Sequence, residues 1–185
     1  SSAASDVYKR QTQMVGSLTI DKKAFEGLSE DEKAEMRNIQ AELDPIREEL
    51  EEIVDTDASS FDGVMAAFKL PKETDEEKKA RSAAIQEGYK KALEIPLRAA
   101  ELCLKAMELQ GIYANCGNKN AITDVGVGTL LLQSGLEGAL FNVLINVNSI
   151  KDEAYAADIR KKADDLLKAG EAKKAETLKI VYSKL

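Results

Sequence analysis

The most apolar part of the chain, residues 116–150, also carries polar side chains of a kind that bind ligands. Asn142 and Asn146 lie one helical turn apart within "LFNVLINV", and Asn118 and Asp124 precede them. Amide groups in such a segment need hydrogen-bond partners, because burying them unpaired is costly. Two interpretations stay open: the asparagines bond at a helix interface, or they bind a flat polar ligand through their donors and acceptors.

A carboxylate in the first half of the chain could serve as an acid or base. Asp57 lies four residues before Phe61, on one face of a predicted helix. The apolar residues of that face recur at helical spacing and predict its burial: Val54, Ala58, Phe61, Met65 and Phe68. A carboxylate facing a core is either paired or has a raised pKa that suits proton transfer. The alternative is a solvated carboxylate at the edge of the face.

Two lysines stand beside a predicted helix end. Lys69 and Lys72 lie in "FKLPKET", between the end of one helix and the start of the next. Lysines near a helix start suit the binding of carboxylates or phosphates. Solvated lysines in a loop are the other interpretation.

Composition excludes several classes of function. The 185 residues carry 26 Lys and Arg against 33 Asp and Glu, a net charge of −7, without a basic patch interleaved with aromatics, so nucleic acid is not an expected partner. Cys103 and Cys116 lack CxxC spacing and the chain has no histidine, which predicts a reduced, cytoplasmic protein without a metal. Gln133, Glu137 and Asn142 interrupt the apolar segment, so no membrane span is expected.

The elements that must position these residues are all helical. Capping boxes at Ser29 and Thr74 predict helices over 30–68 and 75–95, the first kinked or split at Pro45. Pro96 predicts a kink before a helix over 97–114, and "CGN" from 116 to 118 predicts a break. Further helices are expected over 121–147 and from Asp152 onward, the last with a kink at Gly170. The sequence therefore predicts an all-α bundle of long, partly kinked antiparallel helices.

Two ranges divide the chain. Residues 1–11, "SSAASDVYKRQ", have no apolar periodicity and read as an adapter-like non-native segment. Residues 12–185 are expected to form a single domain. Within it, Gly126, Gly128, Gly135 and Gly138 predict close approach of a helix, a subunit or a ligand to the backbone.

Three segments together resemble the cyclodeaminase/cyclohydrolase family, from about Met14 to near the C-terminus. They are "DASSFDGVMAAFKLPKETDEEKKARSAAIQ", "GNKNAITDVGV" and "GALFNVLINVNSIKDEAY". The resemblance implies a homodimeric, all-helical enzyme that binds tetrahydrofolate derivatives without a cofactor. One family reaction hydrolyses 5,10-methenyltetrahydrofolate to 10-formyltetrahydrofolate; the other cyclises 5-formiminotetrahydrofolate with release of ammonia.

The resemblance also implies site residues. Asp57 matches the position of the family's catalytic acid or base, and Lys72 matches the lysine of the LPK motif. We expect Asp57 to move the proton while Lys72 orients the substrate. Asn118, Asp124, Asn142 and Asn146 match polar motif positions, and Lys69 and Arg81 offer positive charge for an acidic substrate.

One departure from the family pattern concerns the N-terminus. Relatives carry a glycine-rich PGGG segment and an Ala/Gly-rich helix where this chain has its adapter-like residues, so the domain is expected to be truncated there. The competing interpretation is a non-catalytic helical assembly protein, in which the glycines and asparagines serve only a subunit interface.

Overall fold

The computed structural model describes residues 14–185, apart from the side chains of Ala24, Val54, Asp55 and residues 57–60. Over these residues the secondary structure is helical and contains no strand. The helices in chain order are α2 (Lys23–Glu26), α3 (Glu30–Ser60), α4 (Asp62–Phe68), α5 (Asp75–Cys116), a 3-10 turn (Lys119–Ala121), α6 (Ile122–Val147) and α7 (Glu153–Ser183). The all-α prediction is confirmed.

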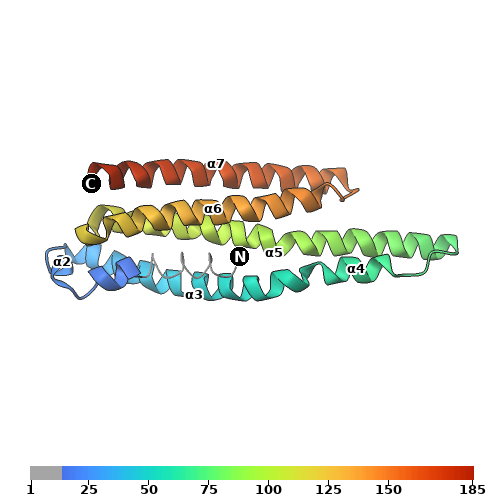
Figure 1. The fold of residues 1–185 in the computed structure, drawn as a ribbon, viewed down its shortest axis with the longest axis horizontal. Coiled ribbons are helices and arrows are strands. Elements are labelled where there is room, and N and C mark those ends of the chain that lie inside the picture. Colours follow the sequence, from blue (N-terminus) through green and yellow to red (C-terminus); the bar gives the residue numbers. More distant parts are fainter. Residues whose placement is uncertain (1–13) are drawn as a thin grey trace.

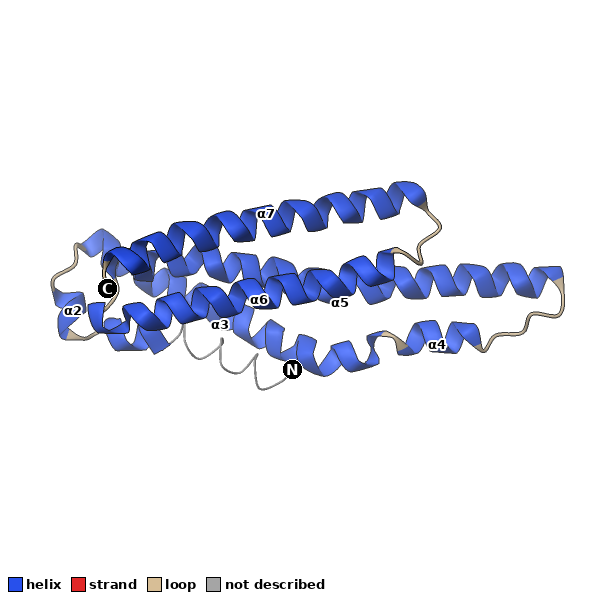
Figure 2. Cartoon of the chain, turned by 45° about the horizontal axis from the view of Figure 1, so that its top comes forward, coloured by secondary structure: helices blue, strands red, loops and turns tan. Residues whose placement is uncertain are grey.

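The long helices lie side by side in an elongated bundle (Figure 1). Helix α5 runs the whole length of the molecule, with α3 and α4 along one side and α6 and α7 along the other. Helix α4 continues in the direction of α3, whereas α5, α6 and α7 each reverse the direction of the helix before them, and both views show this order (Figure 2). At one end α5 continues past the turn between α6 and α7, where α4 lies beside it.

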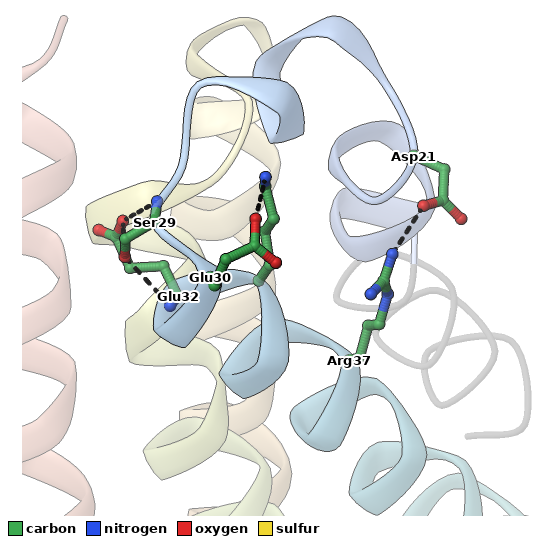
Figure 3. A network of polar contacts seen from close by, with 6 residues as sticks. Asp21, Ser29, Glu30, Glu32 and Arg37 are labelled. Carbon is green, nitrogen blue, oxygen red and sulfur yellow. Dashed lines mark hydrogen bonds and ion pairs between the residues drawn. The ribbon is translucent and has the colours of Figure 1, made fainter.

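Helix α3 begins where its capping box predicts. The Ser29 backbone N–H donates to Glu32 Oε2 at 2.9 Å, and the Glu32 N–H donates back to Ser29 Oγ at 3.3 Å (Figure 3). Arg37 on the next turns pairs with Asp21 at 3.1 Å and fixes the segment before the helix. Thr74 and Glu77 form the second predicted capping box at the start of α5.

The prolines and Gly170 do not divide their helices. Pro45 lies inside α3, Pro96 lies inside α5, and α7 continues through Gly170. The two helical stretches predicted on either side of Pro96 therefore form one continuous helix. Pro96 is buried, and the packing of α5 between its neighbours outweighs the hydrogen bond that one proline removes. The first helix breaks at Phe61 instead, between α3 and α4.

The buried face of α4 also differs from the prediction. Val64 and Ala67 are buried, whereas Phe61, Met65 and Phe68 are 38%, 49% and 43% exposed. Helix α4 turns Val64 towards α5, where Gly88 lets the two backbones approach closely. The large apolar side chains of α4 consequently face outward.

Helix α6 has one face in the core and another on the surface. Leu132, Leu136, Leu140, Val143 and Val147 are buried against α5 and α7. The opposite face exposes Val127, Leu130, Phe141 and Ile145, the last two by 69% and 68%. Over Lys119–Val147 the chain is long and apolar enough to cross a membrane by length and composition alone, with a third of its most apolar window buried in the bundle.

Candidate active site

The loop between α4 and α5 presents the two predicted lysines. Lys69 is the C-cap of α4, and Lys72 follows Pro71 within the six-residue loop before α5. Both side chains are exposed. At the exit of the loop Glu77 Oε2 accepts from the backbone N–H groups of Glu73 at 2.8 Å and Thr74 at 3.0 Å. The backbone just after Lys72 is therefore held in place.

Arg81 lies on the second turn of α5 and reaches back to the same loop. Its Nε and Nη2 donate to the Phe68 carbonyl oxygen at 3.3 and 3.1 Å. Its guanidinium carbon also lies 5.5 Å from the centroid of the Phe68 ring. The structure thus brings Lys69, Lys72 and Arg81 together at one end of the bundle.

Asp57 belongs to the last turn of α3, but its side chain is outside the described residues. The prediction that Asp57 has apolar surroundings depends partly on Phe61 and Phe68, and both of these side chains are substantially exposed. Thr56, the preceding residue, lines a groove of about 310 Å³ between α3 and α5. Glu49, Glu94 and Arg98 line the same groove.

The two asparagines of α6 bond to the backbone of their own helix. Asn142 Nδ2 donates to the Gly138 carbonyl at 3.3 Å, and Asn146 Nδ2 donates to the Asn142 carbonyl at 3.0 Å. Asn142 is exposed and Asn146 half-buried. Both amide N–H groups are therefore satisfied within α6, and neither side chain lies in the core of this chain.

Asn118 and Asp124 lie at the opposite end of α6. Asn118 Oδ1 caps the 3-10 turn by accepting from the Asn120 N–H, and its Nδ2 donates to the Leu18 carbonyl. Asp124 is half-buried in the first turn of α6, where a carboxylate stabilises the helix dipole. At 1.5 Å per residue, Asp124 and Asn142 are about 27 Å apart along the helix. One chain therefore does not gather all the predicted residues into one site.

Gln86 of α5 forms hydrogen bonds with the turn that follows Asn146 and the end of α6. The type of this residue alone does not indicate such a role, so the sequence did not predict it. Its Nε2 donates to the Ser149 carbonyl at 2.9 Å, and its Oε1 accepts from the Lys151 N–H at 2.7 Å. Lys151 Nζ in turn donates to Ser82 Oγ at 3.0 Å, one residue after Arg81. Asn146 and Arg81 consequently lie towards the same end of the bundle.

The described residues contain no group of three or more His, Cys, Asp or Glu side chains that could hold a metal ion. The chemistry available at this end of the bundle is that of ammonium, guanidinium, carboxylate and amide groups. Such groups bind polar heterocycles and acidic tails and can move protons.

Comparisons with known proteins agree on one protein family. The sequence profile of the formiminotransferase-cyclodeaminase family matches residues 10–165. A methenyltetrahydrofolate cyclohydrolase from Methylorubrum extorquens is 36% identical over 172 residues, which cover 93% of this chain and 81% of that protein. The formimidoyltransferase-cyclodeaminase of Sus scrofa is 36% identical over 89% of this chain, which spans only 30% of that longer protein.

A solved structure has the same fold. The formiminotetrahydrofolate cyclodeaminase of Thermotoga maritima superposes with a TM-score of 0.83 over 98% of this chain and 86% of that one. Its sequence is 23% identical, so this comparison concerns the fold alone.

Proposed function

The chain belongs to the formiminotransferase-cyclodeaminase family, and from this membership we propose that it is an enzyme of folate one-carbon metabolism. It hydrolyses 5,10-methenyltetrahydrofolate to 10-formyltetrahydrofolate, or cyclises 5-formiminotetrahydrofolate with release of ammonia, or does both. The observation that carries this proposal is the similarity to a cyclohydrolase over most of the length of both chains. For that reason we favour the hydrolysis.

The proposed hydrolysis needs one group that moves protons and one that holds charge. Water adds to the methenyl carbon of the cationic substrate, and the bond from that carbon to N5 breaks. The added oxygen loses both of its protons as it becomes the formyl carbonyl; N5 gains one and the other is released. With no histidine in the chain, we assign the proton transfer to Asp57 and the orientation of substrate to Lys72. The expected raised pKa of Asp57 is part of this proposal.

A direct assay tests the function. The purified chain is mixed with 5,10-methenyltetrahydrofolate and the loss of its absorbance is followed, and 5-formiminotetrahydrofolate is assayed in parallel for ammonia. We expect turnover of at least one substrate, lost in Asp57→Asn, reduced but still measurable in Lys72→Ala, and kept in Lys179→Ala, which removes an exposed lysine of α7. Full turnover by Asp57→Asn would overturn the assignment of that residue.

Binding without turnover has its own test. A folate that binds the native state raises the melting temperature by mass action. A folded chain that neither turns over nor is stabilised by these folates would instead be the non-catalytic assembly protein considered from the sequence.

We further propose that the enzyme is a homodimer that packs the exposed face of α6 against a second copy. Val127, Leu130, Phe141 and Ile145 recur on that face at three- and four-residue spacing, with Ser134 and Gly138 between them. A Cβ atom added to Gly138 would meet no atom within 4 Å, so the small residues leave room for close approach. The partner's α6 could bring Asn118 and Asp124 to the end that lacks them in one chain.

Light scattering at several concentrations tests the dimer. We expect twice the mass of one chain for the natural sequence, and one chain for Ile145→Lys. Tyr182→Lys is the matched control, since Tyr182 is equally exposed, at 71%, but lies near the end of α7. A monomer that sediments with lipid vesicles, and loses this in Ile145→Lys, would assign the face to a membrane and overturn the dimer.

A further inference from the structure

Arg81 differs from the other cations at this end of the bundle, because its guanidinium is committed to the backbone. Both of its described hydrogen bonds go to the carbonyl oxygen of Phe68, the last residue of α4. The side chain is half-buried, whereas Lys69 and Lys72 are exposed. Because Arg81 Nε and Nη2 both donate to this carbonyl, those two hydrogen bonds are not available to a substrate in this arrangement.

The Phe68 carbonyl is a group that a helix cannot satisfy by itself. The last carbonyl groups of a helix have no partner within it, and the helix dipole favours a cation there. Helix α4 has no basic residue in its own last turn. Arg81 supplies that cation from α5, and its contact with the Phe68 ring fixes the guanidinium over the helix end.

The loop that carries Lys72 is therefore anchored at both ends. Arg81 holds its entry at Phe68, and the Thr74–Glu77 capping box holds its exit. Pro71 restricts the backbone between these anchors, because its ring fixes φ. A side chain on a short loop fixed at both ends samples fewer positions, which is what an orienting group needs.

We propose that Arg81 is a positioning residue that sets the place of Lys72 by capping α4, and not a ligand of the substrate. This inference rests on the proposed function of Lys72. It replaces the sequence-based assignment of Arg81 to substrate binding. Lysine at position 81 would keep the charge but lose the planar fork that places two donors on one oxygen.

The kinetic test is a double-mutant cycle between positions 81 and 72. We expect Arg81→Ala to lower kcat about tenfold with little change in KM, because it misplaces a group needed in the transition state. In a Lys72→Ala background the same change should have almost no further effect. A rise in KM that persists in the Lys72→Ala background would overturn the proposal, since it would mean that Arg81 contacts substrate directly.

A second measurement does not depend on activity. Trypsin cuts after Lys69, and anchoring of the loop should slow this cut. We expect faster cleavage at Lys69 in Arg81→Ala, partial protection in Arg81→Lys, and no change in Lys179→Ala. Lys179 belongs to the C-terminal part of α7 (Glu153–Ser183), and the C-terminus lies at the opposite end of the bundle from the loop between α4 and α5 (Figure 1). Equal cleavage in all four proteins would overturn the anchoring. Faster cleavage without any folate turnover would keep the anchoring and reject the proposed function.

Discussion

The thiol of Cys116 donates to Glu32 Oε1 at 3.2 Å, across the contact between the end of α5 and the start of α3. Burial, then the hydrogen bond and charge of Glu32, raises the pKa of this thiol to about 11. Cys103 is fully inside the bundle, and burial alone raises its pKa to about 12. Both thiols therefore stay protonated at neutral pH, and the thiolate is the form that reacts.

Alkylation rates test this account of Cys116. At pH 8 a thiol of pKa 11 is about 100-fold less ionised than one at the ordinary value of 9.0. We expect iodoacetamide to modify native Cys116 far more slowly than the unfolded chain, and Glu32→Gln to accelerate it several-fold. Cys103 is the internal control, because Glu32→Gln should not affect its rate. Rapid labelling of Cys116 in the folded chain would contradict the prediction.

Glu32 makes a second residue-level contribution through Ser29. The side-chain and backbone bonds from Ser29 favour the charged carboxylate and hold its pKa below the ordinary value. A depressed pKa stabilises the fold above the unfolded pKa, and this contribution disappears as the pH falls through the lower folded pKa. The carboxylate is exposed, so solvent and salt weaken the effect.

Acid titration of stability tests the Ser29 contact. We expect Ser29→Ala to melt at a lower temperature than the natural chain at pH 7. The gap should narrow as the pH falls below the ordinary glutamate value of 4.5 and through the lower folded pKa of Glu32. The gap should depend less on pH in a Glu32→Gln background. A gap that stays constant from pH 7 to pH 3 would show that the charge of Glu32 has no part in it.

At the scale of residues, the sequence predicted which nearby residues lie together better than it predicted the hydrogen bonds of individual side chains. Lys69, Lys72 and Arg81 are neighbours in the chain, so a local motif could place them together. The side-chain bonds of Asn142 and Asn146 to their own helix, and the bridge made by Gln86, depend on which face each helix turns outward. Packing between helices decides which face is exposed, and the type of a single residue does not indicate the result.

Helix starts were the most predictable elements, because a capping box is a local interaction between residues three apart. Both predicted boxes, at Ser29 and Thr74, are confirmed. The effect of the prolines was harder to predict, because it depends on packing between helices and not on a local interaction. Whether a helix continues past Pro96 is decided by α5 packing against α3, α6 and α7, which no local pattern describes.

Two glycines of α5 give a matched test of helix packing. A Cβ atom at Gly111 would meet nothing within 4 Å, whereas one at Gly88 would lie 3.2 Å from the backbone N and Cα of Val64. Alanine is favoured over glycine inside a helix by about 0.5–1 kcal/mol. We expect Gly111→Ala to gain this stability and Gly88→Ala to gain less or lose, because α4 must move. Equal gains in urea unfolding would contradict the close contact.

The whole molecule is a long bundle in which long helices that follow one another in the sequence lie side by side (Figure 2), and α7 also packs against α5. Alternating helices and short connections predicted this antiparallel arrangement well. The sequence could not show which apolar residues remain outside, because a stripe such as Phe141 and Ile145 looks the same whether it packs inside one chain or against another surface.

The protruding end of α5 has a consequence for how the molecule moves. The hairpin of α4 and α5 extends past the turn of α6 and α7 (Figure 1). The Val64–Gly88 contact, the Arg81 cap and the Thr74 box hold it, and Lys151 bonds Ser82 where α5 passes that turn. Regions with few buried contacts open locally at low free energy. Backbone amides of residues 76–81 should therefore exchange with deuterium long before those of residues 92–114. The hairpin that carries the anchored Lys72 loop should thus open as one unit more readily than residues 92–114, and a substrate that bound there would slow this exchange before any reaction occurred.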